Sequence, residues 1–420
     1  MRFGSNFYEN APRVIFSPAR FSFGGVEGNM QTWQGFGEWQ YRLNQGRTGL
    51  PTETAEKIKA LTASLTSPVE KVKAVYEFLQ SKTRYVGVQL GIGGWQTLPA
   101  AHVDEKGYGD CKALTNYTQS LLKAVGIPAY YTLVHADRDI QPIDKDFPAN
   151  YFNHVILCVP LEKDTLWLEC TSQEEAFGYL GDFTDNRFAL AITPQGGKLL
   201  RTPAYTKKHN QLLRQAQIQI AENGEANAQI KTRYQALKEG DRDRWVTYAP
   251  EEQKKYLYEE IDIADFEILS FSLRRQKDRI PYTEELLQLR IPKFATLSGR
   301  RMFITPNLMN QWTTVPEDLE NRQTAIFLNR YYDFYDQDSL TFQVPAGYVP
   351  ESLPKPIKIE SAFGKYEAHF VMENQQLFYY RTFEMNQGVF PKEKYAELSD
   401  FLKAVSRADR NRVVLVKNQE

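Results

Sequence analysis

The stretch Tyr108–Val134, YGDCKALTNYTQSLLKAVGIPAYYTLV, decides the fold of the middle of this 420-residue chain. Asp110 follows a glycine turn and is a favoured N-cap, so a helix is predicted to begin at Cys111. Residues from Leu114 to Val125 recur at helical spacing and form one face of that helix. Gly126, two residues before a proline, predicts where the helix ends.

Three strands are predicted after this helix. The first covers residues 129–136, AYYTLVHA. The second and third are FNHVILCVP at 152–160 and TLWLEC at 165–170, which the short segment LEKD separates. This spacing indicates an antiparallel hairpin.

Cys111 stands at the first turn of the predicted helix. The unpaired N–H groups and the positive end of the helix dipole favour the thiolate there, which is the nucleophilic form of cysteine. The same N–H groups can bind the oxyanion of a tetrahedral intermediate. Lys112 adds a positive charge and is expected to be a solvated surface residue. Taken alone, however, a cysteine at a helix start is more often structural than catalytic.

His154 and Glu169 are the candidate partners of that thiol. A thiol nucleophile needs a base, and the base needs a carboxylate that orients it. His154 begins one strand of the predicted hairpin and Glu169 lies near the end of the other, so antiparallel pairing brings them within cross-strand reach. A carboxylate in an apolar strand also needs a partner. Together with Cys111, these residues indicate thiol catalysis.

These segments resemble the transglutaminase-like superfamily of papain-fold thiol enzymes. The resemblance rests on the 108–134 stretch, on FNHVILCVP and on WLECT at 167–171. It implies an α+β fold with a papain-like core, in which the helix carrying the cysteine packs on an antiparallel sheet. It also implies that Cys111 is the nucleophile, His154 the base and Glu169 the orienting acid. The family usually has Asp at the third position, so Glu169 is a departure that changes the reach to the histidine.

The resemblance leaves the second oxyanion donor open. In papain-like sites this donor is a side chain upstream of the nucleophile. Trp95 and Gln96, directly after the turn GIGG at 91–94, are the candidates, and Gln89 is a weaker one.

No cofactor or metal ion is expected from the motifs. The glycine-rich GIGG turn lacks the spacing of a phosphate-binding loop. An acidic loop lacks the DxDxDG spacing of a calcium site and is expected to be solvated; it contains Asp137, Asp139, Asp144 and Asp146. Cys158 and Cys170 lie in the hairpin strands and are expected to be packed apolar thiols.

Changes in pattern along the chain suggest three regions. Residues 1–45 are expected to be short extended pieces, and the resemblance implies that they are the last strands of a preceding β domain. Residues 46–205 form the core suggested by the resemblance. Residues 206–420 are predicted to form a mostly antiparallel β domain of unknown function, because Asn223-Gly224 marks a hairpin between alternating strands.

Further helices and strands are predicted outside the central stretch. Ser67–Glu70 is a capping box with proline at the first helical position, which starts a helix. RYVGVQL at 84–90 indicates a strand. A final helix is expected to begin near Pro391.

Composition excludes several classes of protein. The chain has 51 Lys and Arg against 52 Asp and Glu, and this net charge of −1 is unlike that of a nucleic-acid-binding protein. No run approaches the roughly 18 apolar residues of a membrane span. The three cysteines are too few, and odd in number, for a disulfide framework. The first residues do not form a signal peptide. The resemblance to large exported Bacteroidetes-type proteins implies a truncated, exported protein, and a cytoplasmic protein is the alternative.

The expected function is thiol-dependent acyl transfer on amide bonds of a peptide or protein substrate. Hydrolysis is favoured over transamidation by the resemblance, although the same three residues serve both. The alternative is a noncatalytic binding or scaffold module that keeps the fold. Carbohydrate binding by the aromatic-rich C-terminal region is a third hypothesis, which rests on composition alone. The sequence does not predict an oligomeric state.

Overall fold

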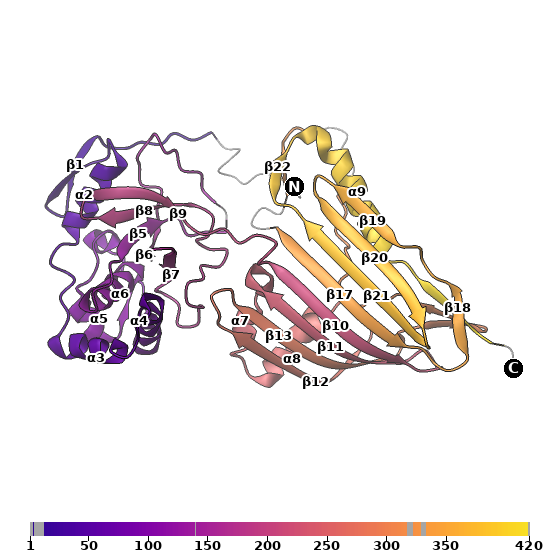
Figure 1. Cartoon of the computed structure of the whole chain (residues 1–420). Coiled ribbons are helices and arrows are strands. Elements are labelled where there is room, and N and C mark those ends of the chain that lie inside the picture. Colours follow the sequence, from indigo (N-terminus) through magenta and orange to yellow (C-terminus); the bar gives the residue numbers. More distant parts are fainter. Residues whose placement is uncertain (1–2, 4–11, 139, 317–321, 329–332, 419–420) are drawn as a thin grey trace. The chain divides into compact units, whose positions relative to one another are not determined.

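The structure, a computed structural model, describes residue 3 and residues 12–138, 140–316, 322–328 and 333–418 (Figure 1). Contacts within the chain divide it into two compact units. The cysteine unit comprises residues 6–204 and 277–279, and the sheet unit comprises residues 1–5, 205–276 and 280–420. Of the N-terminal region 1–45, residues 1–2 and 4–11 lie outside the described part.

The cysteine unit combines helices with a five-stranded antiparallel sheet, an α+β arrangement. The sheet has the order β7-β6-β5-β8-β9, formed by Thr165–Leu168, His154–Pro160, Tyr130–Val134, Phe188–Thr193 and Gly196–Arg201. Its helices are α2 Trp33–Leu43, α3 Thr52–Thr62, α4 Pro68–Lys82, α5 Ala100–Lys106 and α6 Cys111–Ala124, with a 3₁₀ turn at Gly91–Gly94. Two small ribbons complete it, β1 Arg20–Phe23 with β2 Val26–Asn29 and β3 Arg84–Tyr85 with β4 Tyr108–Gly109.

Helix α6 has the bounds that its sequence predicts. The Asp110 side chain caps it by accepting a hydrogen bond from the N–H of Ala113 at 3.0 Å. Gly126 follows the helix with a φ of +74°, the left-handed conformation that favours glycine. The helix packs on β6 and is buried along most of its length. The predicted hairpin is also confirmed, because β6 and β7 pair antiparallel.

Two local expectations are wrong, and a third, the capping box, is confirmed only in that α4 begins at Pro68. Residues 33–43 form helix α2, which packs on β8 and β9, instead of extended pieces. The helix approaches the sheet so closely that a Cβ on Gly37 would lie 2.0 Å from the Gly197 nitrogen. Ser67 precedes α4, but its side chain makes no capping hydrogen bond. The strand expected at 84–90 is reduced to Arg84–Tyr85.

The sheet unit is built on an eight-stranded sheet with the order β12-β13-β11-β10-β17-β21-β20-β19. All neighbours are antiparallel except β10 and β17, which are parallel. The strands are Glu267–Gln276, Tyr282–Ile291, Ala226–Gln235, Gln211–Ile220, Phe334–Gln343, Gln376–Met385, Gly364–Glu373 and Ile357–Ser361. Gly224 has a φ of +83° in the predicted turn between β10 and β11.

Smaller elements complete the sheet unit. A four-stranded sheet has the order β14-β15-β23-β18, formed by Thr296–Ser298, Arg301–Ile304, Val413–Lys417 and Tyr348–Ser352. A two-stranded ribbon pairs β16 Ile326–Leu328 with β22 Gly388–Phe390. The helices are α7 Arg242–Trp245, α8 Pro250–Glu260 and α9 Tyr395–Asp409, with 3₁₀ turns at Ala236–Glu239 and Lys392–Lys394. Helix α9 confirms the helix expected after Pro391.

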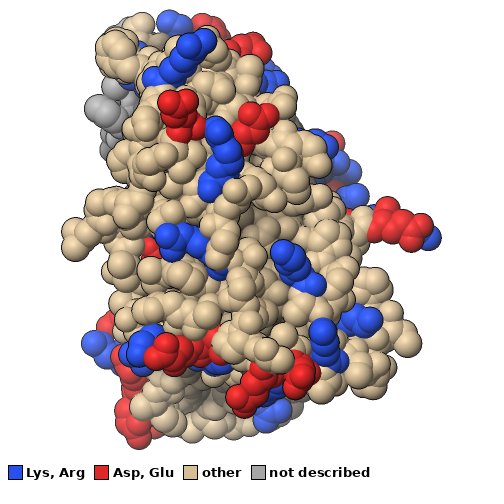
Figure 2. Space-filling model, turned by 90° about the vertical axis from the view of Figure 1, so that its left-hand side faces the viewer, with Lys and Arg blue, Asp and Glu red and all other residues tan. Residues whose placement is uncertain are grey.

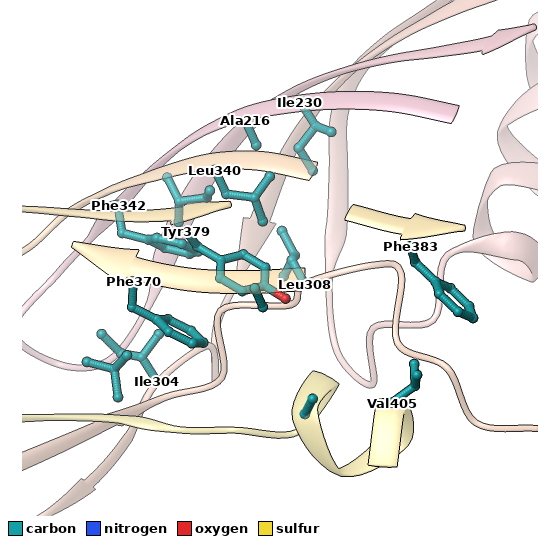
Figure 3. Close-up of a cluster of buried hydrophobic side chains, with 14 of the residues drawn as sticks. Ala216, Ile230, Ile304, Leu308, Leu340, Phe342, Phe370, Tyr379, Phe383 and Val405 are labelled. Carbon is teal, nitrogen blue, oxygen red and sulfur yellow. The ribbon is translucent and has the colours of Figure 1, made fainter. Parts of the chain in front are cut away.

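One face of the large sheet forms the apolar core of this unit. Side chains of the sheet strands meet Ile304, Leu308 and Val405, the last from α9 (Figure 3). Within this region Arg381 is only 1% exposed. Its guanidinium donates to both carboxylate oxygens of Asp409, at 2.7 and 3.1 Å, and to Asp338 at 3.1 Å. A buried charge of this kind is tolerated because it is paired.

Replacing Arg381 tests how far the sheet unit depends on this pairing. R381M keeps much of the side-chain volume but leaves buried carboxylates uncompensated, so we expect the free energy of unfolding to fall by about 3–5 kcal/mol. Urea denaturation followed by circular dichroism measures the change. The exposed pair of Arg301 with Glu351 provides the control. R301M should shift the midpoint far less, and equal shifts for both variants would contradict the interpretation.

Candidate active site

Cys111 lies at the N-terminal end of helix α6 and faces a cavity. It is the first residue of the helix, and 3% of its surface is exposed. The cavity has a volume of about 260 Å³, and both Cys111 and His154 line it. The other lining residues are mostly aromatic, aliphatic or amide side chains: Gln40, Gln89, Trp95, Tyr131, Leu133, Asn150, Phe152, Asn153 and Val155, with Gly94 and Lys112.

The β6–β7 hairpin brings His154 and Glu169 together. Its register pairs Leu157 with Leu168, so Glu169 continues opposite Ile156 and lies diagonal to His154 on the same face. His154 Nε2 lies 2.9 Å from Glu169 Oε2. The other glutamate oxygen accepts hydrogen bonds from the backbone N–H and the hydroxyl of Thr171, at 3.0 and 2.6 Å. The longer glutamate side chain therefore reaches the histidine with both of its oxygens engaged.

The His154 imidazole is held in its charged form. Burial lowers its pKa, but the Glu169 carboxylate and hydrogen bonds to Cys111 and Glu169 outweigh this effect and raise the pKa to about 10. Because Nε2 faces Glu169, Nδ1 is the nitrogen available to the Cys111 thiol. At neutral pH the arrangement supports an imidazolium between a carboxylate and a sulfur atom.

The Glu169 carboxylate is held in its ionised form in spite of its burial. Burial raises its pKa, but the charge and hydrogen bond of His154 and the hydrogen bonds from Thr171 bring it below its ordinary value. Its backbone is also fixed, because the Tyr76 hydroxyl donates to the Glu169 carbonyl at 2.8 Å. Helix α4 thus supports the end of strand β7.

Lys112 is buried, and the expectation of a solvated lysine is wrong. It is 5% exposed, and its ammonium pairs with Asp110 Oδ2. The other Asp110 oxygen caps α6 through Ala113. One carboxylate therefore ties Asp110, which precedes Cys111, to the two residues that follow it. The sequence gave no signal for this burial, because lysine is almost never fully buried unless it is paired, and the pairing with Asp110 is visible only in the structure.

The structure separates the candidates for the oxyanion donor. Trp95 and Gln89 line the cavity with Cys111. Gln96 is engaged elsewhere: its Nε2 donates to the Leu43 carbonyl at 2.7 Å, and its Oε1 accepts from Arg47 at 2.7 Å. The Gln96 amide thus binds the Leu43 carbonyl and the Arg47 side chain, and Gln96 is not among the described residues that line the cavity.

Gln40 is a cavity residue that the sequence analysis missed. It is 1% exposed, lines the cavity, and donates through Nε2 to the Trp95 carbonyl at 3.1 Å. The sequence did contain a signal for Gln40, because it is a polar residue on the apolar face of a helix. Phe36, Trp39 and Leu43 are its buried neighbours on α2. That signal is visible only once residues 33–43 are recognised as a helix.

The other two cysteines lie in apolar surroundings. Cys158 and Cys170 are each 1% exposed and are not bonded to another cysteine. Burial raises the pKa of each thiol to about 12. Both are therefore protonated at neutral pH, in keeping with the expected packing role.

Surface charge, possible metal ligands and helix length describe the rest of the chain. On the face shown in Figure 2, basic and acidic side chains are interspersed. Within the described residues, no group of three His, Cys, Asp or Glu side chains is arranged to hold a metal ion. Asp139 of the acidic loop lies outside these residues. Among the helices that the structure describes, none is long and apolar enough to cross a membrane.

Models of two known protein families match parts of this chain. The model of the transglutaminase-like superfamily matches residues 55–171, the segment that runs from α3 to the Glu169 hydrogen bonds. Residues 55–171 belong to the transglutaminase-like superfamily. A domain of unknown function, DUF3858, matches residues 300–415. The chain thus joins a transglutaminase-like core to a β-rich C-terminal domain.

A solved structure has a similar fold. It is the crystal structure of a protein from Parabacteroides distasonis that is named a "putative protease". The TM-score is 0.53 at 12% sequence identity, over 97% of this chain and 63% of the other. This chain therefore spans less than two thirds of that protein, and at this identity the likeness concerns the fold alone. No curated protein matches the chain.

The charge of Glu169 should control the titration of His154 in the transglutaminase-like core. Glu169 raises the pKa of His154, so E169Q should lower this pKa from about 10 toward its ordinary value. The imidazolium would then be lost at a lower pH. Nitrogen-15 NMR of histidine-labelled protein, recorded from neutral to alkaline pH, measures the shift. E162Q, an exposed substitution in the same hairpin, serves as control; an unchanged His154 titration in E169Q would contradict the electrostatic coupling.

Proposed function

We propose that this protein catalyses thiol-dependent acyl transfer on amide bonds, with hydrolysis of a peptide or protein as the main reaction. The observation that carries the proposal is that Cys111 and His154 line one cavity and that the Glu169 carboxylate is hydrogen-bonded to the His154 imidazole. The helix N-terminus favours a thiolate at Cys111. The 2.9 Å contact to Glu169 orients the imidazole and stabilises its charge.

The residues have distinct roles in this reaction. The Cys111 thiolate attacks the carbonyl carbon of the amide, and a tetrahedral intermediate forms. His154 donates its proton to the departing amine, so that the amine leaves and a thioester remains on Cys111. His154 then accepts a proton from water, which attacks the thioester and releases the acid. Glu169 remains ionised and keeps the imidazole oriented.

The oxyanion of the intermediate needs donors at the start of α6. The N–H groups of a first helical turn have no partners within the helix, so those of Cys111 and Lys112 are available. Gln40, Gln89 and Trp95 supply further donors among the cavity side chains. Among these side chains Gln40 is the best candidate for the oxyanion donor, because it is buried and a hydrogen bond to the Trp95 carbonyl holds its amide in place.

The cavity suits a segment of a chain better than a whole small molecule. Its volume of about 260 Å³ lies below the roughly 300–1,000 Å³ of typical small-molecule pockets. Apolar walls and amide groups match a side chain together with its flanking peptide bonds. These features support a peptide substrate. Transamidation would use the same residues with an amine in place of water.

Replacing the nucleophile gives the direct test of turnover. C111A should lower the rate of peptide hydrolysis by about 10³-fold or more, because the variant has no group to form the thioester. A mixture of peptides from a digested proteome serves as the substrate. Mass spectrometry detects new termini for hydrolysis, and an added amine such as cadaverine reports transamidation.

C158A provides the matched control for C111A. It also removes one cysteine, but from the apolar interior and not from the cavity. Wild-type protein and C158A should cleave the same peptides. Equal turnover in C111A, or its absence in folded wild-type protein, would contradict the proposal and favour the noncatalytic scaffold.

A further inference from the structure

Phe183 is an aromatic side chain that remains 47% exposed beside the imidazole of His154. The two ring centroids lie 5.9 Å apart at an interplanar angle of 62°, an edge-to-face contact. Single exposed apolar residues are common on protein surfaces and need no special explanation. Phe183 differs from them, because buried hydrogen bonds hold the loop that carries it against the histidine.

Arg187 organises this loop. Its side chain is 2% exposed. It donates hydrogen bonds of 2.7 to 3.3 Å to backbone carbonyls on both sides of the loop, those of His135, Asp137, Asp182 and Asp185. The N–H of Asp137 in turn donates to the Phe183 carbonyl at 3.1 Å. A buried guanidinium is stable only with such partners, so the network fixes the backbone on both sides of Phe183.

The charges close to Phe183 are paired with each other. Asp182 lies 3.1 Å from the Arg138 side chain, and Asp185 lies 3.7 Å from Arg187. The acidic residues are therefore matched by cations. The surface that Phe183 offers to a ligand is the exposed part of its apolar ring.

The position of Phe183 indicates which half of the substrate it would contact. In the proposed reaction His154 gives its proton to the departing amine, so the amine half must lie beside the imidazole. Phe183 touches the imidazole but is not among the described residues that line the cavity at Cys111. The cavity is thus left for the acyl half, and Phe183 for the amine half.

We propose that Phe183 determines specificity by binding an apolar or aromatic side chain on the amine half of the substrate. The inference rests on the proposed acyl-transfer function and adds its substrate class, a peptide with an apolar residue after the cleaved bond. By microscopic reversibility, the same contact binds an incoming amine. That amine attacks the carbonyl carbon of the Cys111 thioester, a C–N bond forms and the C–S bond breaks. The amine proton passes to His154 and Cys111 leaves as the thiolate, which restores the thiolate–imidazolium pair.

An acyl-partition experiment tests the proposal. p-Nitrophenyl acetate acylates Cys111, and its leaving group does not require the amine-side contact. Amino-acid amides then compete with water for the acetyl group, and chromatography with mass spectrometry measures the acetylated amide against acetate. Phenylalaninamide and leucinamide should capture the acetyl group about three- to tenfold better than glycinamide, the range expected for an aromatic contact. Lysinamide and the α-amide of aspartic acid, whose side chains are charged, should show no such advantage over glycinamide. C111A gives the uncatalysed background.

Variants of Phe183 assign the preference to this side chain. F183S should bring the ratio of phenylalaninamide to glycinamide capture close to one, whereas F183Y should retain the preference. L61S is the matched control, because Leu61 is 45% exposed on α3 and is not part of the cavity lining. It should keep the wild-type ratio.

The outcomes separate the two proposals. If Cys111 is not acylated, the proposed function fails. If Cys111 is acylated and hydrolysed, the function stands. In that case the role of Phe183 is overturned by capture that ignores the acceptor side chain, by a preference for a charged amide, by the same ratio in F183S, or by failure of every amide to capture the acyl group.

Discussion

The carboxylate of Asp110 is the group on which the active-site region depends. One of its oxygens caps α6 through the N–H of Ala113, and the other pairs with the buried ammonium of Lys112. Both contacts fix the turn that holds Cys111. Since α6 packs on β6, and β6 begins with His154, the capped turn and the histidine meet at the same cavity. The positions of the proposed nucleophile, of the proposed base and of the N–H groups proposed to bind the oxyanion thus follow from where one helix begins.

Each unit contains buried ion pairs, and the surroundings of a pair decide what it can do. In the sheet unit, Arg381 is enclosed by carboxylates and contributes to structure. In the transglutaminase-like core, Glu169 and His154 form a pair of the same kind, but the imidazole also faces a cavity and a thiol. The pairing raises the pKa of His154 and thereby keeps on the imidazole the proton that the proposed reaction needs. A buried ion pair becomes suited to chemistry when one of its members can still reach a substrate.

The sequence was sufficient where local rules decide the structure. A cap, a helical period and a terminal glycine predicted α6, and strand alternation predicted the β6–β7 hairpin, which together place Cys111, His154 and Glu169. Helix α2 was not predicted, because a glycine such as Gly37 is read from the sequence alone as a residue that disfavours a helix. In the structure, Gly37 permits the close approach of α2 to β9. For the same reason Gln40 was missed. Phe183 owes its position to hydrogen bonds from Arg187 to distant loops, and no short motif encodes such contacts.

The proposed reaction requires that Cys111 and His154 form a thiolate–imidazolium pair, and the pH dependence of cysteine alkylation tests for this pair. Folded protein is treated with iodoacetamide from pH 5 to 9, and mass spectrometry assigns the label to each cysteine. Cys158 and Cys170 serve as internal controls, because burial raises the pKa of each to about 12. Cys111 alone should react rapidly well below pH 8 and should lose this behaviour in H154A. A Cys111 that follows the ordinary thiol pKa of about 8.5, or that reacts no faster than an unfolded thiol, would contradict the proposed pair.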